Sequence, residues 1–198
     1  MIDMNFFEVL RNRHSIRAFK KKDVEQEKIN IILEATNLAP SAGNLQAYEI
    51  VVIKDQERRL ALAKAALNQD FIAQAPLNLV FFIDPGRSAR RYGQRGMRLY
   101  CLQDATIAAA YSQLAATALG LGSVWVGAFY EEPIIKLVNA KEDLIPVAII
   151  SIGYPDEKPE ITPRRKIEDI VHDEYISKPY KYEPSRLGLS RLIIDRSR

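Results

Sequence analysis

The sequence has very few of the residues that most often build disulfide frameworks and metal sites. Among its 198 residues there is one cysteine, Cys101, and there are two histidines. A single thiol excludes an intrachain disulfide and favours a reducing, cytoplasmic setting. The chain has no His-Glu-x-x-His motif, no cysteine cluster and no spaced carboxylate trio, so we expect no protein-bound metal. We interpret Cys101 as a buried structural thiol.

Long apolar runs and a dominant charge of one sign are also missing. No apolar run approaches the ~20 residues that a membrane-spanning helix needs, and residues 1–5 do not resemble a signal peptide. The 28 Lys and Arg residues nearly balance the 25 Asp and Glu residues, leaving a net charge of +3. This balance does not resemble the dense basic stripe of a nucleic-acid-binding protein. We therefore expect no membrane and no nucleic acid as partner, and a mild preference for small anions such as phosphates.

The motifs that mark side-chain chemistry are absent as well. The sequence has no Gly-x-Ser-x-Gly elbow, no Walker-type Gly-Lys-Ser/Thr loop and no Gly-x-Gly-x-x-Gly after a strand. If the protein is an enzyme, a bound cofactor should therefore supply the difficult chemistry. We assign no side-chain acid or base.

The elements that are present predict one domain with a single sheet. Short β-branched or apolar runs predict strands, and wider apolar periodicity predicts helices. The mixture favours an α+β or α/β class. Strands are predicted at 48–53, 77–83, 123–126 and 146–152. Helices are predicted from near Asp3, after an N-cap at Asp23, at 56–67, at 97–119 and around Pro133.

Three further segments carry specific expectations. The helix at 97–119 is rich in alanine, which indicates a central core helix or a subunit-interface helix, and its Asp104 is interpreted as a buried, hydrogen-bonded structural acid. Residues 86–96 are basic and contain glycine, so we expect a mobile surface loop. Arg90, Arg91 and Arg95 of this segment are interpreted first as solvated, with contact to a dinucleotide phosphate as the alternative. The tail at 175–198 should pack on another surface, such as a partner subunit.

The densest group of functional side chains is Arg13-His14-Ser15-Ile16-Arg17. If this segment is extended, Arg13, Ser15 and Arg17 point to one side. Two guanidinium groups and a hydroxyl on one side would suit a phosphate, because arginine donates in a planar fork. The alternative is a basic helix end, where cations are also favoured.

Three later segments are candidates for the same site. Pro40, Ser41, Asn44 and Gln46 offer hydrogen-bonding groups for the edge of a heteroaromatic ring, although an ordinary loop is the simpler reading. Residues 120–129 contain three glycines and Trp125, which would also fit a helix end followed by a core residue. Residues 163–166 form a basic turn that would otherwise be solvated.

In this order and spacing, the four segments resemble the nitroreductase family of FMN flavoproteins, from Phe6 to about Val171. The resemblance implies an α+β nitroreductase-like fold with a central mixed or antiparallel sheet flanked by helices, in an intertwined homodimer. It also implies tightly bound FMN, with NADH or NADPH as the electron donor.

The resemblance implies a role for each matching residue. Arg13 and Ser15 would hold the FMN phosphate with His14 alongside, and Arg17 would support the N1/O2 edge of the flavin. The loop of Pro40, Ser41, Asn44 and Gln46 would come from the other subunit. Backbone groups of Val126 and Gly127 would pass close to the ring, since glycine removes the Cβ that would block approach. Arg164 would add a phosphate contact, with Arg165 as a second candidate.

The implied reaction is a ping-pong transfer. A hydride would pass from NAD(P)H to flavin N5, and electrons would then pass to an electron-poor acceptor such as a nitroaromatic or a quinone. The sequence departs from the family at Ala47-Tyr48, where Pro-Trp is usual, and at Lys166, where proline is common. Flavin destruction, reductive dehalogenation, a non-catalytic FMN-binding module and a flavin-free phosphate binder remain as alternatives.

Overall fold

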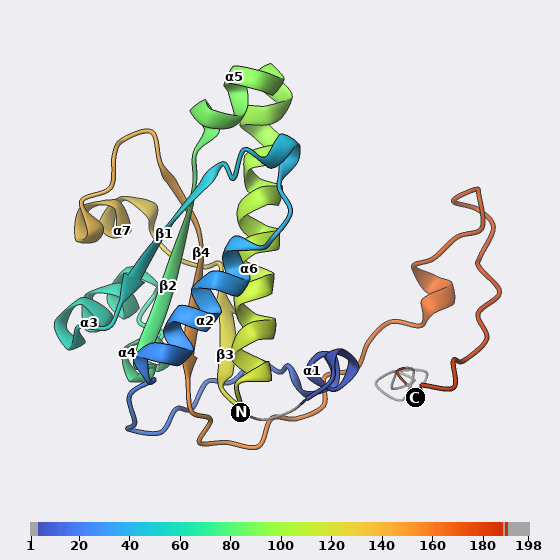
Figure 1. The fold of residues 1–198 in the computed structure, drawn as a ribbon, viewed down its shortest axis with the longest axis horizontal. Helices are drawn as coiled ribbons and strands as arrows, with labels where there is room; N and C mark the ends of the chain where they lie inside the picture. The colour runs from blue at the N-terminus through green and yellow to red at the C-terminus, as the bar shows by residue number, and fades with distance from the viewer. Residues whose placement is uncertain (1–3, 188, 190–198) are drawn as a thin grey trace.

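The computed structural model describes residues 4–187 and 189, and its centre is a four-stranded sheet with helices on both faces (Figure 1). The strands lie in the order β1-β2-β4-β3, and every neighbouring pair is antiparallel. Their bounds are β1 Tyr48–Ile53, β2 Leu77–Ile83, β3 Gly122–Val126 and β4 Ile145–Gly153. The α+β class is confirmed, and the sheet is antiparallel throughout.

Strand β2 is buried on both faces and organises the core. Leu79 and Phe81 pack against the layer that contains α2 (Gln26–Asn37) and α6 (Cys101–Ala118). Val80 and Phe82 face the opposite layer, which contains α3 (Gln56–Ala65), α4 (Phe71–Gln74) and α7 (Glu131–Val138). Full burial of a side chain of this kind contributes about 1.5–3 kcal/mol. The strand predicted at 77–83 is therefore confirmed.

Helix α6 lies along the sheet for its whole length (Figure 1). Its inner face carries fully buried alanines at positions 105, 108, 109 and 116, and small side chains let helix and sheet approach closely. Cys101 is buried, as expected. Within the described residues, no helix is long and apolar enough to cross a membrane.

The first two helices begin later than their predicted starts. Helix α1 (Phe6–Asn12) begins after Asn5, which forms a capping box with Glu8: Asn5 Oδ1 accepts the Glu8 N–H at 3.1 Å, and Glu8 Oε2 accepts the Asn5 N–H at 2.9 Å. Asp3 lies outside the described residues. Helix α2 is not capped by Asp23, because its N-cap is Glu25. The Glu25 side chain does not cap the helix, since its carboxylate accepts the Tyr154 hydroxyl at 2.6 Å.

The prediction of a mobile loop at 86–96 is wrong, because the segment is helical. Helix α5 (Pro85–Arg95) is followed by the π-helix η2 (Gly96–Tyr100), which leads directly into α6. The chain folds back at Gly93, whose φ of +54° favours glycine. A Cβ at Gly96 would lie 2.6 Å from the Ser88 carbonyl oxygen, so the two limbs cross in close contact. We call residues 85–100 the tip hairpin.

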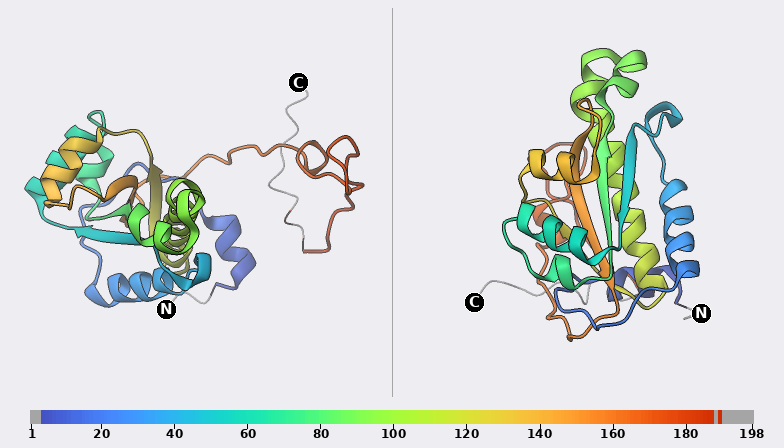
Figure 2. Two further views of the ribbon diagram at one scale, coloured as in Figure 1. Left: turned by 90° about the horizontal axis from the view of Figure 1, so that it is seen from above. Right: turned by 90° about the vertical axis from the view of Figure 1, so that its left-hand side faces the viewer.

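Residues 156–187 form an arm that leaves the sheet and its helices (Figure 2). Its one short helix, η3 (Ile167–Asp169), lies well away from the core (Figure 1). Large apolar side chains on the arm are exposed, including Tyr175 at 68% and Ile176 at 84%. The arm returns to the body where Arg11 Nη2 donates to the Leu187 carbonyl oxygen at 2.9 Å. Residues 188 and 190–198 of the predicted tail lie outside the described residues.

Candidate functional site

The Arg13–Arg17 segment is extended and runs beside the start of β3. The Ile16 N–H donates to the Ser123 carbonyl oxygen at 3.0 Å, and Ser15 forms a parallel bridge with Ser123. Ile16 is buried against Gly122, where an added Cβ would lie 2.7 Å from Ile16 Cγ1. The alternation therefore points Ile16 inward, while Ser15 and Arg17 are exposed.

Arginine side chains meet in a small cleft beside this segment. The cleft has a volume of about 130 Å³ and is lined by Arg11, Arg13 and His14 on one side and by Thr162 and Arg164 on the other. Arg11 donates to the Leu187 carbonyl oxygen. Burial, and then the positive charge of Arg164, lowers the pKa of the Arg13 guanidinium below its usual value. Like charges held together in a half-buried place favour an anion between them. The cleft therefore suits a phosphate.

The side chains of Arg17 and Arg165 do not line the cleft. The backbone N–H groups of Arg17 and Ala18 both donate to the Glu157 carboxylate, so the Arg17 backbone is fixed while its side chain is exposed. Arg164 also donates to the Thr162 carbonyl oxygen at 3.0 Å. Arg165 Nη2 donates to the Asp169 carbonyl oxygen at 2.5 Å and thus closes the turn at η3. Of the two late arginines, only Arg164 lines the cleft.

The second cluster is a rigid turn that contains η1 (Ala42–Asn44). The Gln46 N–H donates to Ser41 Oγ at 3.0 Å, and Gln46 Nε2 donates to Asn37 Oδ1 at 3.0 Å. Asn44 and Gln46 both have positive φ, a conformation that asparagine tolerates better than most residues. Pro40 and Asn44 are exposed, so this turn presents polar groups at the surface.

Asp104 holds this turn from below. It is 2% exposed, and its carboxylate accepts the Ala42 N–H at 2.8 Å and the Ala47 N–H at 3.4 Å. The expectation of a buried, hydrogen-bonded structural acid is confirmed. Its link to the 40–47 turn was not predicted, because an aspartate in an alanine-rich helix carries no sequence signal for its partner.

The two clusters lie at opposite ends of α6 in one chain (Figure 1). Asp104, near the start of the helix, contacts the 40–47 turn, whereas Gln113 Nε2, near its end, donates to Ser123 Oγ at 3.3 Å beside Ser15. Nine residues of helix correspond to about 14 Å. One chain therefore does not bring Ser41, Asn44 and Gln46 to Arg13, Ser15 and Arg17.

The third cluster lies at the end of β3. Val126 is buried and pairs with Ile149 of β4, whereas Gly127 is exposed. A Cβ on Gly127 would meet only the Trp125 indole Nε1, at an ordinary 3.7 Å. Contacts within the chain therefore give no reason for glycine at this position. Trp125 is half-buried and packs on the core, which agrees with the interpretation of Trp125 as a core residue.

Comparison with known proteins places these observations in a family. The chain matches the model of the nitroreductase family over residues 10–69 and 60–154. It is 31% identical over 178 residues to the FMN reductase [NAD(P)H] of Bacillus subtilis, covering 83% of this chain and 72% of that protein. It is also 31% identical over 176 residues to the NADPH-flavin oxidoreductase of Vibrio harveyi, covering 85% and 73%.

A solved structure agrees with this assignment. The FMN-dependent nitroreductase from Clostridium difficile R20291 superimposes with a TM-score of 0.68 and 32% identity, covering 77% of this chain and 88% of that chain. Within the described part of the chain, no cluster of His, Cys, Asp or Glu suited to a metal ion is found. The matches to family model, sequence relatives and solved structure agree, and the chain belongs to the nitroreductase family.

Proposed function

We propose that this protein is an NAD(P)H-dependent FMN oxidoreductase that acts as a homodimer and reduces an electron-poor acceptor, such as a nitroaromatic or a quinone. The observation that carries the proposal is the cleft in which Arg13 and Arg164 face each other. The relatives named as an FMN reductase and an NADPH-flavin oxidoreductase support the choice of cofactor and donor.

The residues on the two sides of the cleft fit the phosphate end of FMN. Arg13 and Arg164 would supply charge-assisted hydrogen bonds, and the exposed Ser15 hydroxyl would add one more. The Arg17 side chain, exposed next to them, would reach the N1/O2 edge of the ring. When bound, FMN supplies the redox chemistry by accepting a hydride from NAD(P)H and passing electrons to the acceptor.

The protein's own contribution is then binding and electrostatic support. Arg17 would stabilise the negative charge that develops at the N1/O2 edge, without giving up or accepting a proton. Gly127 would leave room for the ring to approach the end of β3. The proposal requires no side-chain acid or base.

A second copy of the chain would complete the site. Because the 40–46 turn lies at the far end of α6 from Arg13, we place its Ser41, Asn44 and Gln46 at the flavin of another subunit. Exposed apolar side chains on α1 and α6 support such an interface: Phe6 is 61% exposed and Tyr111 is 37% exposed. The arm, whose segment from about residue 175 carries exposed Tyr175 and Ile176, would pack on the partner.

The first test is flavin uptake followed by reduction. We expect the purified protein to bind FMN, with the flavin absorbance lost on anaerobic mixing with NADH or NADPH and recovered on adding a quinone. A protein that takes up no FMN contradicts the proposal. A protein that binds FMN but is not reduced by either donor is a binding module and not an enzyme.

A second test separates the two arginine roles. Arg17→Ala should slow reduction of bound FMN more than it weakens FMN binding, whereas Arg13→Ala should mainly weaken binding. Reduction at the wild-type rate in Arg17→Ala would contradict the role at N1/O2. The matched control is Lys64→Ala, an exposed cation on α3.

A further inference from the structure

The excess positive charge of the chain is concentrated at the tip hairpin. Residues 84–104 contain five arginines, no lysine, no glutamate and two aspartates. This segment therefore accounts for the whole net charge of +3, and the rest of the chain is neutral. A basic site this localised calls for an explanation beyond general solubility.

Neither aspartate neutralises the outer part of the hairpin. Asp84 Oδ2 pairs with Arg87 Nε at 3.2 Å, and Arg87 also pairs with Glu49 at 2.7 Å. Asp104 is occupied by the backbone of the 40–47 turn. Among the described residues of the tip hairpin, the exposed arginines that remain without a carboxylate partner are Arg90, Arg91, Arg95 and Arg98.

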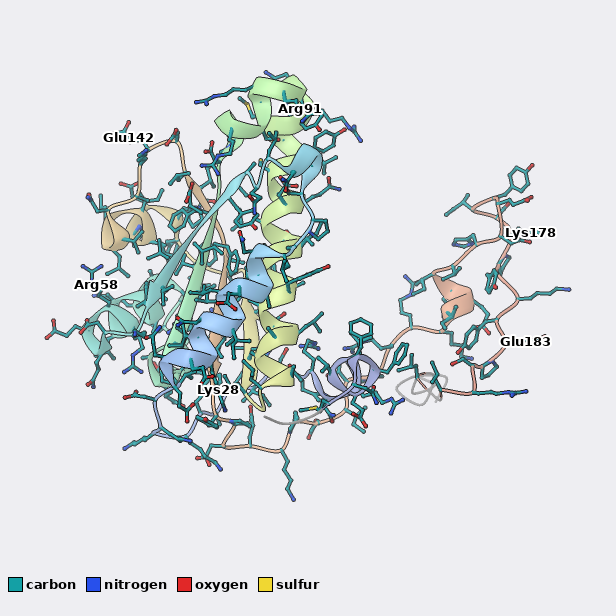
Figure 3. The ribbon with its side chains drawn as sticks, viewed as in Figure 1. Lys28, Arg58, Arg91, Glu142, Lys178 and Glu183 are labelled. Atoms are coloured by element: carbon teal, nitrogen blue, oxygen red, sulfur yellow. The ribbon has the colours of Figure 1, made fainter. Side chains whose placement is uncertain are left out.

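The fold gathers these four arginines in one place. Arg90 and Arg91 lie before the reversal at Gly93, and Arg95 and Arg98 lie after it. The close crossing of Gly96 and Ser88 keeps the two limbs together. Figure 3 shows Arg91 at the tip, with long side chains around it. A cluster of like charges on one short segment attracts anions.

Aromatic rings accompany the arginines. Tyr92 and Tyr100 meet edge to face at 5.1 Å, and Arg95 Nε donates to the Tyr100 hydroxyl at 3.0 Å. Tyr100 also lines a hollow of about 620 Å³ whose other walls include Pro40 and Ser41 of the turn that the proposed function places at a flavin. Guanidinium groups without carboxylate partners, beside aromatic rings, suit the phosphates of a nucleotide.

The hairpin is fastened to the turn that the proposed function places at the flavin. Arg87 Nη1 donates to the Gln46 carbonyl oxygen at 2.9 Å, and Arg91 Nη1 donates to the Gly43 carbonyl oxygen at 3.3 Å. Gly43 also packs tightly on Tyr92, since an added Cβ would lie 2.4 Å from the Tyr92 hydroxyl. In the dimer the arginines would therefore lie at the rim of the flavin site.

We infer that the tip hairpin binds the phosphates of the electron donor, and that it selects NADPH over NADH through the 2′-phosphate. This inference rests on the proposed function. The charges match: a pyrophosphate carries about two negative charges and the 2′-phosphate adds about two more, against four arginines without a carboxylate partner. NADH would leave half of that positive charge unmatched.

A binding experiment tests the inference without any turnover. Adenosine 2′,5′-bisphosphate and 5′-AMP are titrated into the FMN-loaded protein by calorimetry. We expect the bisphosphate to bind at least tenfold more tightly, with a strong dependence on salt. The double variant Arg90→Gln/Arg98→Gln should lose this difference, while Lys64→Gln/Lys21→Gln, with the same change in charge, should keep it. Equal binding of the two nucleotides by the wild-type protein would overturn the inference.

Kinetics give the second measurement. In Arg90→Gln/Arg98→Gln we expect KM for NADPH to rise at least tenfold and KM for NADH to rise much less, with FMN content and dimer mass unchanged. A variant that dissociates into monomers, or one whose KM rises equally for both donors, would show that the arginines serve the interface or the fold instead. If the wild-type protein binds no FMN, the proposed function is contradicted. The nucleotide titration can then be repeated without FMN, and it still tests whether the tip hairpin binds the 2′-phosphate.

Discussion

The two ends of α6 carry two basic sites that are built in different ways. At the C-terminal end, Arg13 and Arg164 are brought together around a small half-buried cleft by a segment whose backbone pairs with β3. At the N-terminal end, the arginines at positions 90, 91, 95 and 98 of the tip hairpin are exposed. Buried charges are poorly screened by salt, whereas exposed ones are strongly screened.

This difference corresponds to two kinds of ligand. A cofactor that stays bound through every turnover needs a preorganised, partly buried cleft. A donor that enters and leaves in each turnover is better served by an exposed cluster that attracts it and then releases it. We therefore expect the affinity for FMN to depend weakly on salt concentration and the affinity for the electron donor to depend on it strongly.

The largest effect, on the affinity for FMN, should come from removing the positive charges of Arg13 and Arg164 from the cleft. Arg13→Ala/Arg164→Ala removes two charge-assisted hydrogen bonds worth about 1.5–3 kcal/mol each, so the Kd for FMN should rise at least 100-fold. Fluorescence quenching of FMN on titration measures this. Lys64→Ala provides the control, and an unchanged Kd in the double variant would mean that the cleft is not the phosphate site.

The next effect concerns the backbone that holds the cleft in place. Gly122→Val would place a side chain where a Cβ is already 2.7 Å from Ile16 Cγ1. Overpacking of this kind costs about 1–3 kcal/mol, and moving Ile16 would also shift Ser15. Urea unfolding measures the lost stability. Adding Ile16→Ala should recover part of it, and a purely additive double mutant would show that the contact is not the cause.

How far the sequence predicts this architecture depends on the kind of signal. Strand β2 is predictable because six of its seven residues are apolar, Asn78 being the exception. The Arg13–Arg17 segment is predictable because its side chains alternate between the two sides of a short extended stretch. The tip hairpin is not predictable in this way. Its helical limbs pack through Ser88 and Gly96, so they show no apolar periodicity.

Two other features depend on contacts distant in sequence. The predicted start of α2, after an N-cap at Asp23, is wrong. The Glu25 side chain at the observed start is held by a hydrogen bond from Tyr154, which comes 129 residues later in the sequence. The separation of the 40–46 turn from Arg13 follows from the direction of α6, which no motif encodes. A motif predicts which residues share a site, but it does not predict where the fold places them within one chain.

A smaller effect is expected at the N-terminal end of α6. Asp104→Asn keeps one carbonyl acceptor but leaves the second buried backbone N–H of the 40–47 turn without a partner. This should cost about 1 kcal/mol, the low end of the range for an unpaired buried donor. Thermal unfolding measures the cost, and FMN phosphate binding should change little because the Arg13–Arg17 segment lies toward the other end of α6. If FMN binding fell as much as in the arginine double variant, the two ends would not be independent.

The smallest effect concerns the electrostatic contacts that hold the start of α2. The Tyr154 hydroxyl donates to the Glu25 carboxylate, and with the Lys22 ammonium it lowers the pKa of Glu25 from 4.5 to about 2. Because the folded-state pKa is lowered, this contribution to stability is present above about pH 4.5 and is lost as the pH falls toward 2. The group is exposed, so the change in stability should be small.

The pKa itself is a sharper observable than stability for this contact. Titration of the Glu25 side-chain carbon by NMR should give a midpoint near 2 in the wild-type protein. Tyr154→Phe should raise that midpoint more than Lys22→Gln does, because the hydroxyl hydrogen bond is the larger cause. An ordinary pKa in the wild-type protein would show that Glu25 is free to cap α2, and that the helix start has another explanation.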